Sequence, residues 1–270
     1  MSQERVYAIA SGKGGVGKTT TTVNLGTALA GAGERVAVID ADLGMANLAG
    51  FVSLEPDSAT LHDVLAGRAT IDEATYRLAD NIVGVPSGSS LDGYSKTSPE
   101  GLADVVETLR KTVHYVLLDV GAGVSHETVL PLGLADGVIV VTVPEPAAVR
   151  DAEKTIELTD RAGGSVEGLV VTRTRPAGDV DPERIAEELD IPLLGTIPED
   201  RAVRESIYAG TPLVVHAPRC PAAAAYRRIA ADLGGASADS QRRGRKRRAS
   251  RSGIRTSTGA SSAITDAERD

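Results

Sequence analysis

A glycine-rich segment near the N-terminus has the residue types and spacing of a phosphate site. Residues Gly12-Lys-Gly-Gly-Val-Gly-Lys-Thr19 fit GxxxxGK(S/T) and separate a β-branched apolar run from a stretch with helical patterning. Glycines let successive backbone N–H groups turn toward phosphate oxygens, and a helix N-terminus adds partial positive charge. We predict that Lys18 reaches the β- and γ-phosphates of ATP and that the Thr19 hydroxyl binds Mg²⁺. The predicted nucleotide-binding residues here are Gly12, Lys13, Gly14, Gly15, Val16, Gly17, Lys18, Thr19 and Thr20.

Three carboxylates stand at or just after the ends of apolar runs. Asp40 ends one run, Asp42 follows two residues later, and Asp119 ends the run Val116-Leu-Leu-Asp119. Because the carboxyl ends of parallel strands meet at one edge of a sheet, we expect these side chains beside the phosphates. A carboxylate there can orient water and accept its proton, and Asp119 fits a ligand of a Mg²⁺-bound water. Asp40 or Asp42 could instead cap the turn that follows.

The elements that must position these residues follow from hydrophobic patterning. Short β-branched runs alternate with helix-patterned stretches, which indicates a doubly wound α/β fold with a mostly parallel sheet and helices on both faces. The predicted strands are Val6 to Ala10, Val36 to Asp40, Asn81 to Val85, His114 to Asp119, Gly137 to Val143, Val166 to Thr172 and Leu193 to Ile197. The predicted helices are Lys18 to Gly31, Thr60 to Ala66, Pro99 to Lys111, Pro146 to Arg161, Pro182 to Leu189, Arg201 to Ala209 and Pro221 to Leu233.

The body and the C-terminal tail of the chain differ in composition. Residues 236–270 hold nine Lys+Arg against four Asp+Glu, whereas residues 1–235 hold 20 against 33. The tail is rich in Ser, Ala, Arg, Gly and Thr, and it offers too little apolar area to offset chain entropy. We therefore expect one domain over residues 1–235 and a disordered basic, Ser-rich tail over residues 236–270.

Composition also excludes or disfavours several classes of protein. The single cysteine, Cys220, rules out a disulfide within one chain and a Cys-x-x-Cys metal centre. No run of about 18 apolar residues is present, and the N-terminus lacks a signal-peptide pattern, so we expect a cytoplasmic protein. The acidic body disfavours tight binding of its surface to DNA. The scattered histidines are interpreted as structural residues: His62, His114, His126 and His216.

A second lysine at the start of the loop distinguishes this segment from an ordinary phosphate loop. The sequence KGGVGKTTT, followed by Val38-Ile-Asp-Ala-Asp-Leu-Gly-Met-Ala-Asn47-Leu, resembles the deviant Walker A family of MinD and ParA P-loop ATPases, and most of all archaeal MinD-like proteins. The resemblance implies that two ATP-bound subunits face each other and that Lys13 of each crosses to the phosphates of its partner. It also implies that Asp42 holds the attacking water, that Asp40 supports the Mg²⁺ shell and that Asn47 belongs to the first switch.

Further positions follow from the same resemblance. Val120-Gly-Ala-Gly123 corresponds to the second switch, where relatives usually carry Pro in place of Gly121. Glu145 is expected to touch the opposite nucleotide, and Asp151 to hold Lys13 when ATP is absent; a surface pair of Arg150 with Asp151 is the alternative. The adenine pocket is expected to include Arg173, Pro198 and Asp200, with Pro198 packing on the base.

These expectations predict a MinD-type ATPase that dimerises with ATP and positions a cellular partner at a division site, a pole or a surface appendage. A ParA-like DNA or plasmid partition ATPase is the alternative, since it shares the same site. An Fe–S scaffold ATPase is disfavoured by the cysteine count, and a metabolic ligase would need a substrate site that no motif indicates.

The partners expected outside the dimer depend on the tail. After Leu233 its only bulky aliphatic residues are Ile254 and Ile264, so it lacks the amphipathic helix that anchors membrane-bound relatives. The arginine-rich run Arg242 to Arg248 could meet an acidic protein, anionic lipid or nucleic acid. We expect an activating protein partner, with recruitment to the cell pole or inner membrane surface as an alternative to a free cytoplasmic protein.

Overall fold

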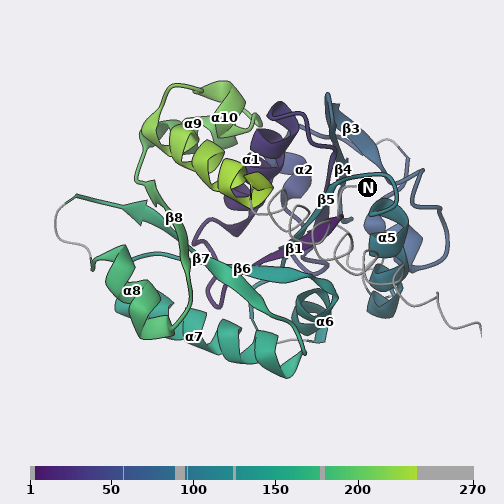
Figure 1. Cartoon of the computed structure of the whole chain (residues 1–270). Coiled ribbons are helices and arrows are strands. Elements are labelled where there is room, and N and C mark those ends of the chain that lie inside the picture. The colour runs from purple at the N-terminus through teal and green to yellow at the C-terminus, as the bar shows by residue number, and fades with distance from the viewer. Residues whose placement is uncertain are drawn as a thin grey trace, which may run out of the picture.

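The computed structural model describes residues 4–56, 58–88, 95, 97–123, 126–176 and 180–235, with the side chains of His126 and Glu127 left out. Figure 1 shows a central twisted sheet with helices packed on both of its faces. The doubly wound α/β fold predicted from the sequence is confirmed. The tail predicted over residues 236–270 lies outside the described residues.

One sheet of eight strands forms the centre of the described structure, in the order β3-β4-β2-β5-β1-β6-β7-β8. All neighbouring strands are parallel except β3 and β4, which are antiparallel. The middle strands are almost entirely buried because helices cover both of their faces, which explains their continuous apolar runs. The strands are β1 (Arg5–Ala10), β2 (Val36–Ala41), β3 (Tyr76–Ala79), β4 (Ile82–Val85), β5 (Tyr115–Val120), β6 (Gly137–Thr142), β7 (Val166–Thr174) and β8 (Leu193–Pro198).

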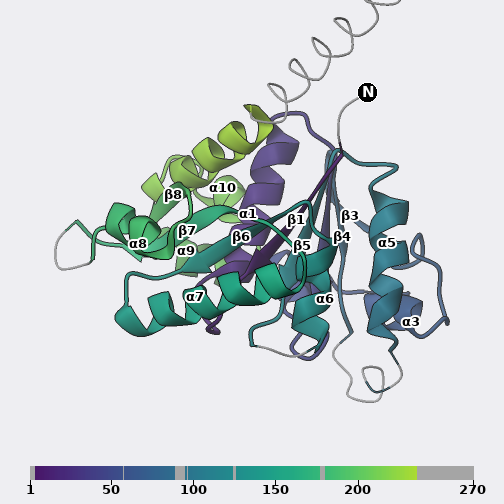
Figure 2. The same ribbon diagram turned by 60° about the horizontal axis from the view of Figure 1, so that its bottom comes forward.

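The helices form two layers around this sheet. The elements outside the sheet are α1 (Lys18–Gly31), α2 (Leu48–Phe51), α3 (Leu61–Leu65), the 3₁₀ turn η1 (Pro99–Gly101), α5 (Leu102–Leu109), α6 (His126–Leu134), α7 (Pro146–Arg161), α8 (Pro182–Leu189), α9 (Arg201–Tyr208) and α10 (Leu213–His216). Residues 221–235 form a further helix. Figure 2 shows α5, α6 and α7 on one side of the sheet and α1 on the other.

Side chains of alternating direction divide the core between these layers. In β1, Val6 and Ala8 join the apolar cluster that includes α5, α7 and α8, whereas Tyr7 and Ile9 join the cluster that includes α1, α10 and residues 221–235. Successive side chains of a strand point to opposite faces, so one strand supplies both cores. The loop after β1 lies at the carboxyl edge of the sheet. It leads directly into α1 and passes close to α7.

Four elements of the described structure were absent from the sequence prediction: the four-residue helices α2 and α10, the strand β3 and the helix α6. Strand β3 is an edge strand whose residues alternate between half-buried and exposed, so it lacks a continuous apolar run. Helix α6 contains Pro131 in its interior, a residue that removes a helical hydrogen bond and so gives a loop-like pattern.

Candidate functional site

The glycine-rich loop connects β1 to α1 and is held by neighbouring elements. Gly15 has a φ of 79° and Gly17 a φ of 101°, left-handed conformations that favour glycine. The Thr172 hydroxyl at the end of β7 donates a hydrogen bond of 2.6 Å to the carbonyl of Val16. A Cβ added to Gly12 would lie 2.0 Å from the backbone oxygen of Asp151 on α7. The loop conformation is therefore fixed by its own glycines and by contacts to β7 and α7.

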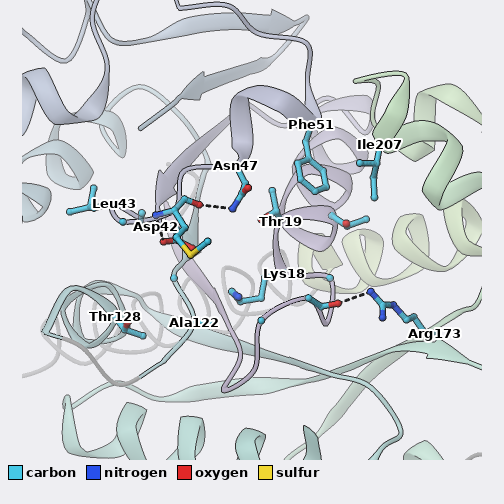
Figure 3. A pocket seen from close by; sticks show the side chains of 18 residues that line it. Lys18, Thr19, Asp42, Leu43, Asn47, Phe51, Ala122, Thr128, Arg173 and Ile207 are labelled. Carbon is cyan, nitrogen blue, oxygen red and sulfur yellow. Dashed lines mark hydrogen bonds between the residues drawn. The ribbon is translucent and has the colours of Figure 1, made fainter. Parts of the chain in front are cut away.

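A cavity of about 610 Å³ opens beside this loop. Figure 3 shows Lys18 and Thr19 from the start of α1, with Asp42 from the segment after β2, around one space. Burial lowers the pKa of Lys18, an effect that Asp119 and Asp42 oppose. The cavity is lined by Gly14, Gly15, Gly17, Lys18, Thr19, Thr20, Ala41, Asp42, Leu43, Gly44, Met45, Asn47, Phe51, Gly121, Ala122, Thr128, Arg173 and Ile207.

Two carboxylates lie side by side behind the cavity. Asp40 and Asp119 are register partners on the neighbouring strands β2 and β5, and both side chains are buried. The carboxylate of Asp119 accepts hydrogen bonds from the hydroxyls of Thr19 and Thr22, the latter over 3.2 Å. Burial raises the pKa of both carboxyls, and for Asp40 the neighbouring Asp119 raises it further. Asp119 therefore lies beside two threonines of α1, and its predicted role at a Mg²⁺ site stays a prediction.

Asp40 accepts hydrogen bonds from the segment that follows β2. Its Oδ2 accepts the backbone N–H groups of Asn47 and Leu48, each over 3.0 Å, and its Oδ1 accepts that of Asp42 over 3.3 Å. Asp40 does not line the cavity. Its carboxylate instead binds the start of α2, as a cap does, and so holds residues 42–48 against β2. These contacts are those of a cap, the alternative raised from the sequence, and a place for Asp40 in the Mg²⁺ shell stays a prediction.

Asp42 faces the cavity from the first of two facing loops. Its Oδ1 accepts the backbone N–H of Met45 over 3.0 Å, so part of the carboxylate also stabilises its own turn. A Cβ at Gly121, in the loop after β5, would lie 3.1 Å from this oxygen. The loops predicted to be the two switches therefore touch at these residues. Asn47 donates from its amide to the carbonyl of Met45 within the first loop, as Figure 3 shows.

Lys13 lies apart from the other loop residues. Its Nζ is 3.4 Å from Oε2 of Glu145, and both side chains are about half exposed or more, at 46% and 62%. Lys13 does not line the cavity of its own chain. Asp151, which we expected to hold Lys13, is paired with Lys154 over 3.0 Å instead, because these residues stand one helical turn apart on α7.

A second cavity of about 330 Å³ adjoins the first. The two share Gly17, Thr20, Arg173 and Ile207 in their linings. The structure brings together the three residues predicted for an adenine pocket, since all of them line this space: Arg173, Pro198 and Asp200. Asp200 also caps α9 by accepting the N–H of Ala202 over 2.9 Å.

Sequence reasoning missed one residue that supports this second cavity. Tyr226, from the helix over residues 221–235, forms part of its wall, whereas Thr172, which also binds the loop, lines it beside Arg173. The Tyr226 hydroxyl lies 3.3 Å from that of Thr21, and burial raises the pKa of Tyr226 to about 12. No motif marks a tyrosine in a helix so far along the chain from the loop, so only the fold reveals the role of Tyr226.

The described residues also bear on metal binding and on membrane crossing. No group of three or more His, Cys, Asp or Glu side chains in this part of the chain is arranged to hold a metal ion. Of the helices that the structure describes, none combines the length and apolar character needed to cross a bilayer.

Comparison with known proteins identifies the family. The model of the CobQ/CobB/MinD/ParA nucleotide binding domain matches residues 7–213, which include the loop, the carboxylates and most of the second cavity. The chain belongs to this family. The resemblance to MinD and ParA drawn from the loop and the following aspartates is therefore confirmed.

Relatives of this MinD/ParA-family chain share most of its length. An uncharacterised ATP-binding protein of Methanocaldococcus jannaschii is 42% identical over 240 residues, which are 88% of this chain and 91% of that protein. The septum site-determining protein MinD of Pyrococcus horikoshii, solved with Mg-ADP, is 33% identical with a TM-score of 0.82, covering 87% of this chain and 99% of that one. A chain of the MinC:MinD complex of Aquifex aeolicus is 30% identical with a TM-score of 0.76, covering 86% and 96%.

Proposed function

We propose that this MinD/ParA-family protein binds ATP with Mg²⁺, dimerises around the nucleotide and hydrolyses it, as a MinD-type switch that positions a cellular partner. The observation that carries the proposal is the place of Lys13. Its side chain is not among those that line the cavity of its own chain, and 46% of it is exposed beside Glu145. A second copy that meets this face supplies a cation to the opposite phosphates.

The triphosphate is assigned to the larger cavity. Backbone N–H groups of the loop and the N-terminus of α1 favour anionic oxygens, and Lys18 adds a partly buried positive charge. The base is assigned to the adjoining cavity, between Arg173, Pro198 and Asp200. The solved relative with Mg-ADP and the relative named as ATP-binding support this assignment.

Oxygen ligands for Mg²⁺ are available where the cavity meets the sheet. The hydroxyl of Thr19 and the carboxylate of Asp119 are hydrogen-bonded to each other. Mg²⁺ is usually bound by only a few protein oxygens together with the phosphate oxygens of the substrate. Mg²⁺, when bound, neutralises charge on the β- and γ-phosphates. Asp40 acts behind this pair by holding residues 42–48, on which the proposed water-orienting carboxylate of Asp42 stands.

A turnover measurement tests the dimer directly. With ATP and Mg²⁺, wild-type turnover per subunit should rise with protein concentration as the dimer forms. Light scattering at the same concentrations measures the fraction of dimer. Lys13→Ala should bind ATP but lose turnover, and Asp42→Ala should dimerise with ATP and not hydrolyse it. Lys111→Ala, which removes an exposed lysine elsewhere, is the matched control. A protein that stays monomeric and hydrolyses ATP at a rate independent of its concentration would refute the proposal.

The partner is proposed to be a protein, since a MinC:MinD complex exists for a relative of similar fold. A ParA-like role on DNA is the second candidate; it would need a basic surface, and the excess of 33 Asp+Glu over 20 Lys+Arg in residues 1–235 disfavours it. Pull-down of the ATP-bound protein with nonspecific DNA, with and without residues 236–270, separates the two. Imaging a fluorescent fusion beside its Lys13→Ala variant then tests the proposed recruitment to a pole or membrane against a nucleoid signal.

A further inference from the structure

A buried histidine outside the motifs contacts the first switch. His62 is the second residue of α3 and only 2% of its surface is exposed. Its Nε2 lies 3.0 Å from the carbonyl oxygen of Leu43, the residue directly after Asp42. A carbonyl oxygen can only accept, so the Nε2 proton is donated to Leu43.

The imidazole is held in place from its other side. Helix α3 starts with a capping box between Thr60 and Asp63, and the N–H of Leu61 donates over 2.8 Å to the carbonyl of Pro86, just after β4. A Cβ at Gly88 would lie 2.8 Å from Nδ1 of His62. The ring is therefore packed between the backbone after β4 and the backbone of the first switch.

The contact completes a clamp around Asp42. Its own N–H is bound by Asp40, and the carbonyl of the next residue is bound by His62. Fixing the backbone on both sides of Asp42 fixes the direction in which its side chain leaves the chain. Small displacements of a positioned group can cost about 100-fold in rate.

We infer that His62 is a positioning residue for Asp42: it holds the first switch so that the water-orienting carboxylate faces the nucleotide cavity. This inference rests on the proposed hydrolysis. His62 is not itself a lining residue of either cavity and reaches the first one only through the backbone carbonyl of Leu43, so its loss should leave nucleotide binding largely intact.

Three variants of the full-length protein test this role. His62→Phe keeps the ring volume and removes the donor, and we expect kcat to fall about 10-fold or more with a KM for ATP within about twofold. His62→Gln places an amide N–H near the same carbonyl and should restore kcat to within about threefold of wild type. Leu65→Val loosens the same helix without changing the donor, and its kcat should match that of wild type.

Hydrogen exchange of the amides in residues 42–48 gives a second readout that does not depend on turnover. Exchange should quicken in His62→Phe and return to the wild-type rate in His62→Gln. Unchanged exchange in His62→Phe, equal kcat in the Phe and Gln variants, or an equal loss in Leu65→Val would each overturn the inference. A wild-type protein without turnover would instead refute the proposed hydrolysis, while exchange would still decide whether His62 holds the segment.

Discussion

Arg173 donates a hydrogen bond of 2.6 Å from Nη2 to the carbonyl oxygen of Gly15, so a residue near the end of β7 binds the backbone of the phosphate loop. Arg173 achieves this with a φ of 55°, a left-handed conformation that Asn accepts more readily than most residues. The same side chain lines both cavities. Arg173 therefore links the conformation of the loop to the space assigned to the nucleotide.

Removing this side chain should weaken nucleotide binding. We expect Arg173→Ala and Arg173→Asn each to reduce ATP affinity by about fivefold, since one hydrogen bond of about 1 kcal/mol is lost. Arg173→Asn should melt at a higher temperature than Arg173→Ala, because Asn accepts the left-handed backbone. Calorimetric titration and thermal unfolding check both statements. Unchanged ATP affinity in both variants would show that the hydrogen bond from Arg173 to Gly15 does not contribute to nucleotide binding.

Two glycines of the loop should respond differently to the same substitution. In Gly12→Ala the new Cβ meets the backbone of α7, so we expect a loss of about 1 to 3 kcal/mol in the free energy of unfolding. Gly14 has no heavy atom within 4 Å of such a Cβ, and Gly14→Ala should change stability by less than about 0.5 kcal/mol. Urea unfolding of the two variants measures the difference. Equal stabilities would contradict the close contact of the loop with α7.

The capping box of α3 gives a prediction with pH. Partial burial tends to raise the pKa of Asp63, but hydrogen bonds from Thr60 and Arg68 outweigh it and lower that pKa below its usual value of 3.8. A lowered folded-state pKa stabilises the protein above the unfolded pKa, and this contribution is lost as the pH falls through the folded value. Asp63→Ala should therefore lose about 1 kcal/mol at pH 7, the usual worth of a cap.

The effect of Asp63→Ala should shrink toward zero as the pH is lowered below the usual carboxyl pKa of about 4. Urea midpoints of wild type and variant between pH 7 and pH 3 provide the measurement. A difference that stays constant over this range would show that the charge of Asp63 contributes nothing.

Tyr226 should contribute to both stability and the base cavity. Tyr226→Phe loses only the contact with Thr21, and we expect a cost of about 1 kcal/mol in the free energy of unfolding. Tyr226→Ala should cost about 3 to 5 kcal/mol and weaken ATP binding, because a buried wall of the cavity is removed. Tyr208→Ala is the matched control, since Tyr208 is 79% exposed. Equal effects of the two alanine variants would rule out this role of Tyr226.

The parts of the fold with strong periodic signals were predictable from sequence. The motif from Gly12 to Thr19 predicted the strand before it and the helix after it. Buried strands such as β2 and β5 were recognisable as apolar runs that end in aspartate. The edge strand β3 and the proline-containing α6 were not predictable, because an exposed edge and an interior proline weaken the pattern.

Within the candidate site, sequence indicated which residues gather at the edge but not what each one contacts. Asp40 and Asp42 are two residues apart and look equivalent in the sequence, yet one binds backbone N–H groups while the other faces the cavity. The partner of Lys13 depends on side-chain geometry across α7, and His62 carries no motif. Such contacts join residues far apart in the chain, so local patterns do not encode them.

The helix over residues 221–235 determines where reporters should be attached. Tyr226 of this helix lines the second cavity, so a shortened chain that ends before it would lack part of the site that we propose for the base. A label fused directly after residue 235 would adjoin a helix that lines this cavity. Strand β1 begins at Arg5, at the opposite end of the strand from the loop, so a fluorescent protein is better attached ahead of β1.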